Sequence, residues 1–175
     1  MEKPISIYIS IPLTVLLNSV GSIINCVENL INSYDKPVGI SRHTRGDFYN
    51  SKLLEESDIF IFRHPGNRFS FNSKSLSKGV RKELQYAIDN KKKILLSYLT
   101  ISEERIYEIN IKEDKSSHNK DTLEYHIEGI IGYINPILMK VILNKIKPTV
   151  LNSSNDQIFS EELQQQLDKV KLLSL

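Results

Sequence analysis

The residues of this chain that are best suited to chemistry lie in one stretch, Ser77-Lys78-Gly79-Val80-Arg81-Lys82-Glu83. The pattern predicts a helix over residues 78–90, in which Glu83 comes one to two turns after the start. On a helical wheel Glu83 falls at the edge of an apolar stripe, so its carboxylate points partly towards the protein interior. The stripe consists of Val80, Leu84, Ala87 and Ile88. A carboxylate in that position costs free energy unless it is paired or used, which makes Glu83 a candidate nucleophile.

The start of the predicted helix is also suited to binding an anion. Ser77 is placed to cap the helix, and the free backbone N–H groups of the first turn favour negative charge. Gly79 allows a ligand to approach the backbone closely. The alternative is that Glu83 is a boundary residue, paired with Arg81, Lys82 or solvent.

Four predicted strands and three predicted helices in the first hundred residues have to position these groups. The strands span residues 5–11, 38–40, 58–62 and 93–98, and the helices span residues 18–33, 48–57 and 78–90. Alternation of this kind predicts an α/β fold, a single-domain Rossmann-like (flavodoxin-like) parallel sheet with helices on both faces. Ligands bind such sheets beyond the carboxyl ends of the strands, and the helix that carries Glu83 begins at that edge.

Three basic side chains in loops at this edge are candidate substrate ligands. Arg42 and Arg45 follow the second strand, where they are suited to hold a phosphate. His64 follows the third strand and is suited to protonate a leaving base. The alternatives are a solvated loop for the two arginines and a plain turn residue for the histidine.

Beyond residue 100 the predicted helices and strands no longer alternate regularly. A strand is expected over residues 106–111, a helix or a strand over residues 122–135, and helices over residues 136–145 and 160–173. The last helix has an apolar stripe, formed by Leu163, Leu167 and Val170, and an acidic first turn. We therefore expect an α/β domain over residues 1–147, followed by a linker and a C-terminal helical extension over residues 148–175.

Composition argues against several classes of protein. The net charge of +2 points to no particular partner, and basic and aromatic residues are not interleaved, so no nucleic-acid polymer is expected as a ligand. The one cysteine, Cys26, lies in an apolar-periodic run and is expected to be a small buried hydrophobe. The histidines have no metal-site spacing. No apolar stretch is long enough for a bilayer span and the N-terminus lacks signal-peptide features, so we expect a cytoplasmic protein without a membrane partner.

Three segments taken together resemble a known family. The stretch Ser77-x-Gly79-Val80-x-x-Glu83-Leu84, with Ala87 after it, is similar to the motif Ser-x-Gly-Val-x-x-Glu-Leu-x-x-Ala of nucleotide N-glycosidases related to nucleoside 2-deoxyribosyltransferases. Residues 8–14 (Tyr-Ile-Ser-Ile-Pro-Leu-Thr) are similar to that family's first strand and loop, and residues 57–61 (Ser-Asp-Ile-Phe-Ile) are similar to a later strand. The resemblance covers about residues 5–98. It favours the 2′-deoxynucleoside 5′-monophosphate N-hydrolase branch, because the transferases commonly carry an acidic residue at the position of Ser77.

The resemblance implies a role for each matched residue. Glu83 would be the nucleophile that attacks C1′ of the sugar and forms a covalent glycosyl-enzyme intermediate. Tyr8 would orient that carboxylate through a hydrogen bond, Asp58 would stand near the sugar and base, and Ser77 would bind the 5′-phosphate. From the residues alone, the alternatives are a tyrosine on the polar face of a strand and a capping or turn aspartate at a strand end.

We therefore expect a hydrolase that cleaves the N-glycosidic bond of a (deoxy)nucleoside 5′-monophosphate or related nucleotide, or a deoxyribosyltransferase, without a metal or organic cofactor. Ser10 and Gly79 are expected to line the substrate site. The enzymes that the chain resembles are oligomers, so a homodimer or higher homo-oligomer is expected. Two alternatives stay open. One is a non-catalytic nucleotide-binding module, supported by Ile11 where the family has glycine. The other is an NAD-cleaving or nucleotide-signal domain of similar fold.

Overall fold

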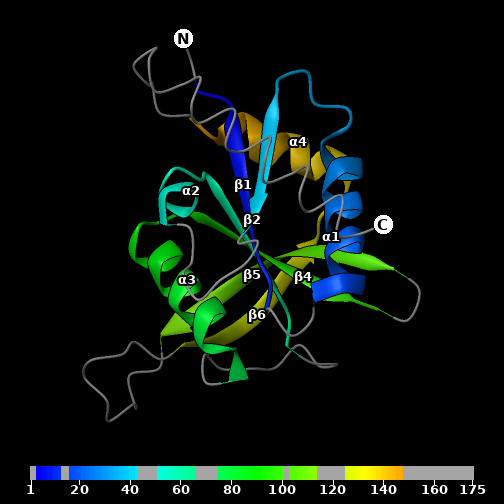
Figure 1. The fold of residues 1–175 in the computed structure, drawn as a ribbon. Helices are drawn as coiled ribbons and strands as arrows, with labels where there is room; N and C mark the ends of the chain where they lie inside the picture. Colours follow the sequence, from blue (N-terminus) through cyan, green and yellow to red (C-terminus); the bar gives the residue numbers. More distant parts are fainter. Residues whose placement is uncertain are drawn as a thin grey trace.

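A computed structural model describes residues 3–12, 16–42, 51–65, 75–100, 103–113 and 125–147 (Figure 1). The elements in these residues are β1 (Ile5–Ser10), α1 (Leu16–Ile31), β2 (Val38–Arg42), α2 (Ser51–Glu55), β3 (Ile59–Arg63), α3 (Lys78–Asp89), β4 (Lys93–Leu99), β5 (Glu104–Glu113), β6 (Tyr125–Tyr133) and α4 (Pro136–Lys145). The predicted extension over residues 148–175 lies outside the described residues. No helix in the described part of the chain is both long enough and apolar enough to cross a lipid bilayer.

The strands form one mixed sheet in the order β2-β1-β3-β4-β5-β6. The first four strands in this order are parallel, as the alternation of strands and helices predicts. The prediction of a parallel sheet is wrong for the rest, because β5 pairs antiparallel with β4 and β6 pairs antiparallel with β5. Only residues 100–103 separate β4 from β5, and a parallel crossover needs a dozen or more residues. The short connection therefore forces the chain to return antiparallel.

The segment that the sequence left open between helix and strand is the edge strand β6. Its residues Tyr125 and Ile127 are buried and alternate with more exposed neighbours, which is the period of a strand covered on one face. Gly129 and Gly132 lie in its second half, where they disfavour a helix. The register between β5 and β6 shifts twice, as it does at β-bulges.

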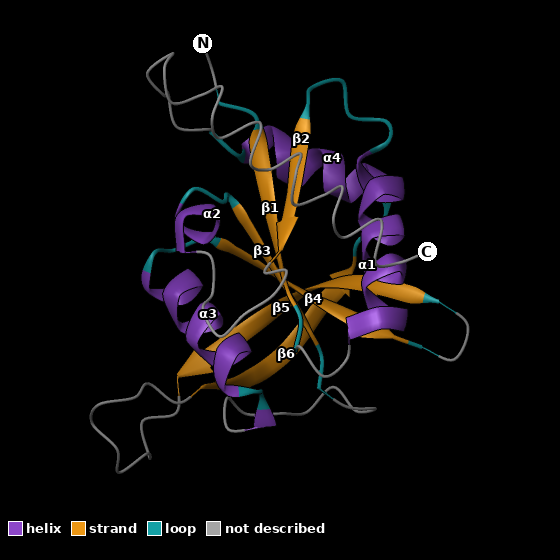
Figure 2. Ribbon diagram, in the orientation of Figure 1, coloured by secondary structure: helices purple, strands orange, loops and turns teal. Residues whose placement is uncertain are grey.

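Helices cover both faces of the sheet, α1 and α4 on one face and α2 and α3 on the other (Figures 1 and 2). The core under α1 and α4 takes helix residues such as Ile23, Val27, Met139 and Leu143. The core under α2 and α3 takes Leu53, Leu54, Val80, Leu84 and Ala87. Full burial of one such Leu, Ile or Val side chain contributes about 1.5–3 kcal/mol, so the two cores together hold the helices on the sheet.

The strand β1 presents apolar side chains to one face of the sheet and polar side chains to the other. Ile5, Ile7 and Ile9 point into the core under α1 and α4. Tyr8 belongs to the core under α2 and α3, so its strand neighbours at two-residue spacing, Ser6 and Ser10, share that side. All of β1 is buried, which means that its polar row is enclosed beneath the helices.

The sheet has a switch in strand order between β1 and β3. From β1 the chain goes to β2 on one side, and from β3 it goes to β4 on the other side. In open α/β sheets the crevice beyond the carboxyl ends of two such strands is where ligands bind. β1 ends at Ser10 and β3 ends at Arg63, so these residues mark the crevice.

Candidate active site

Glu83 lies in the second turn of α3 with its carboxylate against β1. The residue is only 5% exposed, which fits the position at the edge of the apolar stripe that the helical wheel gives it. The Tyr8 hydroxyl donates a hydrogen bond to Oε1 of Glu83 at 3.1 Å. The Ser10 hydroxyl donates a hydrogen bond to Oε2. One face of β1 thus supplies a donor to each carboxylate oxygen, which stabilises the charged form and fixes its orientation.

The ring of Tyr8 is held in place by an aromatic row. It stacks on Phe60 of the neighbouring strand β3, with ring centroids 6.1 Å apart and an angle of 9° between the planes. Phe60 in turn stacks on Phe62 at 6.3 Å. Tyr8 is fully buried, so its ring has little freedom and its hydroxyl is aimed at Glu83 by packing.

Ser10 reaches the second oxygen because of where β1 ends. It lies two residues after Tyr8, so both side chains are on the face that α3 covers. It pairs in register with Phe62 of β3 and is 1% exposed. Ser10 is therefore the group that connects Glu83 to the carboxyl edge of the sheet.

The start of α3 has the form that the sequence predicts. Ser77 is the N-cap, and its hydroxyl accepts a hydrogen bond from the backbone N–H of Val80 at 3.4 Å. Ser77 and Gly79 are both exposed. A Cβ atom placed on Gly79 meets nothing within 4 Å, so open space lies beside this residue. A ligand can therefore approach the backbone at Gly79.

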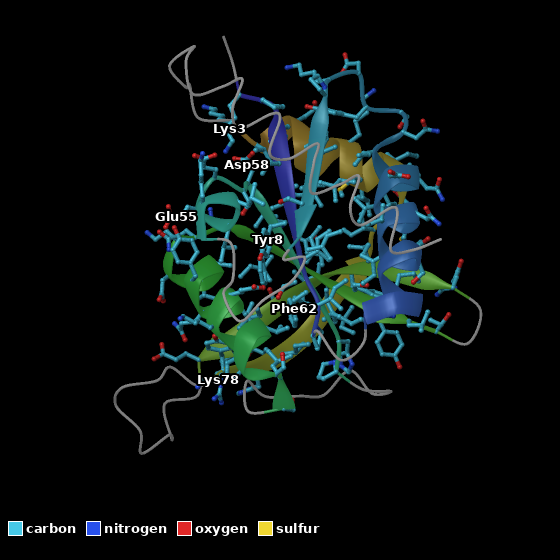
Figure 3. All side chains as sticks on the ribbon, viewed as in Figure 1. Lys3, Tyr8, Glu55, Asp58, Phe62 and Lys78 are labelled. Carbon is cyan, nitrogen blue, oxygen red and sulfur yellow. The ribbon has the colours of Figure 1, made fainter. Side chains whose placement is uncertain are left out.

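The described contacts of Asp58 are with Ser6 and Lys3 and not with Glu83, so its place beside the sugar and base stays a prediction. It precedes β3, and its carboxylate accepts a hydrogen bond from the backbone N–H of Ser6 at 2.9 Å and lies 3.8 Å from Nζ of Lys3. These contacts hold it at the amino end of the parallel strands, with Tyr8 further along the sheet (Figure 3). Burial lowers the pKa of Lys3, and the nearby Asp58 and Glu56 carboxylates oppose that shift. Asp58 therefore anchors the N-terminal segment to the start of β3.

The basic candidates are placed in different ways. His64 is 7% exposed, so it is not an exposed turn residue. Its backbone N–H donates to the Ser97 carbonyl at 2.8 Å, and its ring packs edge-on against Tyr98 at 5.1 Å. Arg42 is the last residue of β2, paired with Ile9, and nothing is described of its side chain. Arg45 lies outside the described residues.

A second buried carboxylate, Glu104, lies on the face covered by α1. Nη2 of Arg63 donates to it at 2.8 Å in an ion pair in which both side chains are almost fully buried. The hydroxyl of Ser22 donates to the same oxygen at 3.0 Å, and Ser97 donates to the other oxygen. The sequence gives no sign of this cluster, because Arg63 and Glu104 are 41 residues apart and each looks like an ordinary strand-end residue.

Cys26 belongs to the surroundings of the Glu104 cluster. Its thiol donates to the backbone carbonyl of Glu104 at 3.4 Å. Burial, helped by the negative charges of Glu104 and Glu103, raises the pKa of the Cys26 thiol to about 11. A thiol with such a pKa is protonated at neutral pH, but Cys26 is half-buried and not the fully buried small hydrophobe that the sequence predicts.

Ser41 is a further candidate ligand that the sequence did not point to. It pairs in register with Tyr8 from the neighbouring strand β2, and it is 1% exposed. No described residue gives its hydroxyl a hydrogen-bond partner. A buried hydroxyl without a partner costs about 1–3 kcal/mol, so a substrate hydroxyl that bonds to it would recover that free energy.

Comparison of the chain with protein-family models, with curated proteins and with solved structures found no match. Among the described residues, no three His, Cys, Asp or Glu side chains come together as ligands for a metal ion. The candidate site is thus a buried carboxylate held by two hydroxyl donors, close to the start of α3 and to the crevice of the sheet.

Proposed function

We propose that this protein is a nucleotide N-glycosidase of the nucleoside 2-deoxyribosyltransferase-like superfamily. It would cleave the N-glycosidic bond of a (deoxy)nucleoside 5′-monophosphate or a related nucleotide. The observation that carries the proposal is the Glu83 carboxylate, 5% exposed and held by the hydroxyls of Tyr8 and Ser10. Two fixed donors hold such a carboxylate in one orientation, which is a property that a nucleophile needs.

In the proposed reaction Glu83 attacks C1′ of the sugar. The bond from C1′ to the base nitrogen breaks, its electron pair goes to the base, and the base takes up a proton from solvent and leaves. Water then hydrolyses the glycosyl ester on Glu83, which regenerates the carboxylate, releases the sugar phosphate and returns a proton to solvent. The hydroxyls of Tyr8 and Ser10 hold the carboxylate in position before the attack. They hydrogen-bond to it again when hydrolysis restores it.

The 5′-phosphate in this proposal is bound by the start of α3. Ser77 and the exposed backbone around Gly79 offer a hydroxyl and free N–H groups, and the helix dipole favours an anion there. Ser41, whose hydroxyl has no described partner, would accept or donate a hydrogen bond to the sugar. The substrate therefore lies across the switch point, with its phosphate at α3 and its sugar above β1.

The position of Ile11 favours catalysis over the alternative of a non-catalytic nucleotide-binding module. Its side chain packs against the core under α1 and α4, which is the face of the sheet opposite Glu83. The isoleucine that replaces the family's glycine thus does not occupy the α3 side, where the Glu83 carboxylate lies.

Three further features belong to the same proposal. The four parallel strands and their helices would correspond to the Rossmann-like core of the superfamily, with β5 and β6 as an antiparallel addition. The protein would act in the cytoplasm, without a metal or organic cofactor. It would assemble into a homodimer or higher homo-oligomer, as the enzymes it resembles do.

The test is release of free base from a panel of nucleoside monophosphates, nucleosides and NAD. We expect release from a monophosphate by the unaltered protein, and none by Glu83→Gln. The matched control is Glu55→Gln, which makes the same change at an exposed position on α2. Mass spectrometry of acid-quenched reactions should find a sugar phosphate on the peptide that contains Glu83.

Other outcomes of this assay decide between the alternatives. Release of nicotinamide from NAD favours the NAD-cleaving domain, and saturable nucleotide binding without base release favours the non-catalytic module. Full activity in Glu83→Gln contradicts the proposed mechanism.

A further inference from the structure

A hollow rich in lysine lies at the amino ends of the parallel strands, and we name it the basic hollow. It has a volume of about 670 Å³, and its lining includes six lysines from several segments, namely Lys3, Lys91, Lys92, Lys93, Lys145 and Lys147. Sites for small ligands have volumes of about 300–1,000 Å³, so a ligand has room here. Figure 3 shows Lys3, Glu55 and Asp58 at this end of the molecule, with Phe62 and Lys78 towards the other end. The basic hollow is therefore separate from the carboxyl edge of the sheet, where the candidate active site lies.

Positive charge in the basic hollow exceeds negative charge. The carboxylates in its lining are those of Glu55, Glu56 and Asp58. Among the six lysines, Lys93 already forms an ion pair with Glu108, which lies outside the hollow. The other five lysines face three carboxylates, which leaves an excess of two positive charges. Such an excess attracts an anion that carries more than one negative charge.

Two of the ammonium groups are fixed on the same turn of backbone. Lys92 donates hydrogen bonds to the carbonyl oxygens of Glu55 at 3.0 Å and Ser57 at 2.7 Å. Lys3, which is 4% exposed, donates to the carbonyl oxygen of Glu56 between them. Burial lowers the pKa of Lys92, and the positive charge of Lys3 lowers it further, while nearby carboxylates oppose the shift. An ammonium has three N–H donors and the described residues give Lys92 acceptors for two, so a bound anion would take the third and reduce the repulsion from Lys3.

Lys91 holds a strained backbone conformation at the rim of the hollow. Its φ is 54°, and it is the one residue other than glycine with a positive φ in the described part of the chain. Helices often end with a residue in this conformation, but that residue is usually glycine because a Cβ atom costs free energy there. The dipole of α3 favours a lysine after the helix, and Lys92 and Lys93 supply one without strain. Strain of this kind is typical of binding sites, so the charge of Lys91 indicates a ligand.

We propose that the basic hollow binds the phosphate chain of a polyphosphate, either inorganic or part of a nucleotide. Lys91 and Lys92 contact the chain from the end of α3, Lys145 and Lys147 from the end of α4, and Lys3 from the segment before β1. An ammonium group binds phosphate as a compact point charge. Lysines from three separate segments suit a chain of several phosphates better than one small anion. This site goes beyond the proposed function and does not depend on it.

The test is isothermal titration calorimetry of the full-length chain with inorganic tripolyphosphate, without metal ions. At about 0.15 M salt we expect saturable binding with a Kd below about 1 mM, which weakens as salt is added. Lys92→Met keeps the aliphatic stem and should weaken binding by at least about tenfold. Lys91→Gly should weaken binding by about fivefold and yet raise the melting temperature, because glycine relieves the strain. A purely structural lysine would not produce that opposition, and Lys91→Gly keeps the test decisive if Lys92→Met folds poorly.

The matched control uses two exposed lysines of α4. Lys145 lines the basic hollow and Lys140 does not. Lys145→Met should weaken binding by about fivefold, whereas Lys140→Met should change the Kd by less than about twofold. Equal losses in the two variants would show only an effect of net charge and would overturn the site.

Three other results would also overturn the proposal. The first is the absence of saturable binding up to about 5 mM tripolyphosphate. The second is loss of binding in Ser77→Ala with full binding in Lys91→Gly, which would place the anion at the start of α3, in the proposed active site. The third concerns ATP, which should bind within about threefold of tripolyphosphate because the lysines contact phosphate. A preference of more than about 30-fold for ATP would show that the nucleoside is recognised instead of the phosphate chain.

Discussion

Glu83 and Glu104 are two buried carboxylates near the carboxyl ends of the parallel strands, one on each face of the sheet. Glu104 is held by the guanidinium of Arg63 together with the hydroxyls of Ser22 and Ser97. The contacts described for Glu83 come from two hydroxyls, those of Tyr8 and Ser10. An ion pair ties a carboxylate to a charged partner, and hydroxyl donors fix its orientation.

These contacts indicate which of the two carboxylates is suited to react. A nucleophile must leave its partners for an electrophile, and hydrogen bonds from hydroxyls are easily rearranged. Separating Glu104 from Arg63 would leave two uncompensated charges in the interior. We therefore assign Glu83 to chemistry and Glu104 to the stability of the fold, and four predictions test that division.

The largest effect is expected for Glu83→Gln. The amide keeps the shape of the side chain and accepts hydrogen bonds from Tyr8 and Ser10, but it is a poor nucleophile. Base release should fall by at least about 10³-fold, or about 4 kcal/mol in the barrier, while the melting temperature changes little. Glu104→Gln is the counterpart, and it should lower the melting temperature but leave the rate per folded molecule nearly intact. Equal losses of rate in both variants would remove the distinction between the two carboxylates.

The second prediction concerns the stability of the ion pair. Arg63→Met removes the cation and leaves the Glu104 charge buried, so the free energy of unfolding should fall by about 3–5 kcal/mol. Chemical denaturation followed by circular dichroism measures this loss. The double variant Arg63→Met with Glu104→Leu should recover much of it, because an apolar pair of similar volume replaces the ions. No recovery would indicate that Arg63 acts through contacts other than Glu104.

The third prediction separates the two donors of Glu83. Tyr8→Phe removes the hydrogen bond to Oε1 and keeps the ring on Phe60, so the fold should be retained. A hydrogen bond to a charged group contributes about 1.5–3 kcal/mol, so base release should slow by about 10- to 100-fold. Ser10→Ala removes the other donor and should have an effect of the same order. An unchanged kcat in both variants would show that the two hydroxyls contribute to the packing of the core but not to catalysis.

The smallest effect is expected at Cys26, which reports the charge of Glu104. The pKa of the thiol is raised to about 11 by burial and by the negative charges of Glu104 and Glu103, so alkylation should be slow at neutral pH and rise towards pH 11. Glu104→Gln removes one of these charges and should shift the pH profile of alkylation downwards. An unshifted profile would mean that the charge of Glu104 does not contribute to the pKa of Cys26.

The same thiol has a defined effect on stability. Its pKa is higher in the folded protein than the ordinary value of 9.0, so the folded state holds the proton more tightly. The stabilisation is present below pH 9 and is lost as the pH rises from 9 to about 11. Denaturation curves across that range should show the decline in the unaltered chain and a smaller decline in Cys26→Ser.

The parts of the molecule that the sequence predicts are those set by local periodicity. The period of α3 places Glu83 at the edge of its buried stripe, and the period of β1 places Tyr8 and Ser10 on one face. The alternation of strands and helices gives the four parallel strands. In each case the information lies within a dozen neighbouring residues, so a pattern along the chain is sufficient.

The parts that the sequence does not predict depend on pairing between distant segments. The contacts of Asp58 with the backbone of Ser6 and the side chain of Lys3 form only when β3 lies beside β1. Arg63 and Glu104 become an ion pair only when β5 returns beside β4. The antiparallel return is set by the short connection after β4. The length of that connection is known only when the last residue of β4 is known.

The two-sided character of β1 has a consequence for how this protein tolerates insertions and deletions. Adding or removing one residue inside Ile5–Ser10 would turn the residues on one side of the change to the opposite face of the sheet, isoleucines towards α3 and polar residues towards α1. Both cores and the candidate nucleophile's donors would then be lost in a single event. An insertion or deletion in β1 is therefore far more damaging than a substitution of one of its residues. The two cores and the candidate site therefore both depend on the length of the six-residue strand β1.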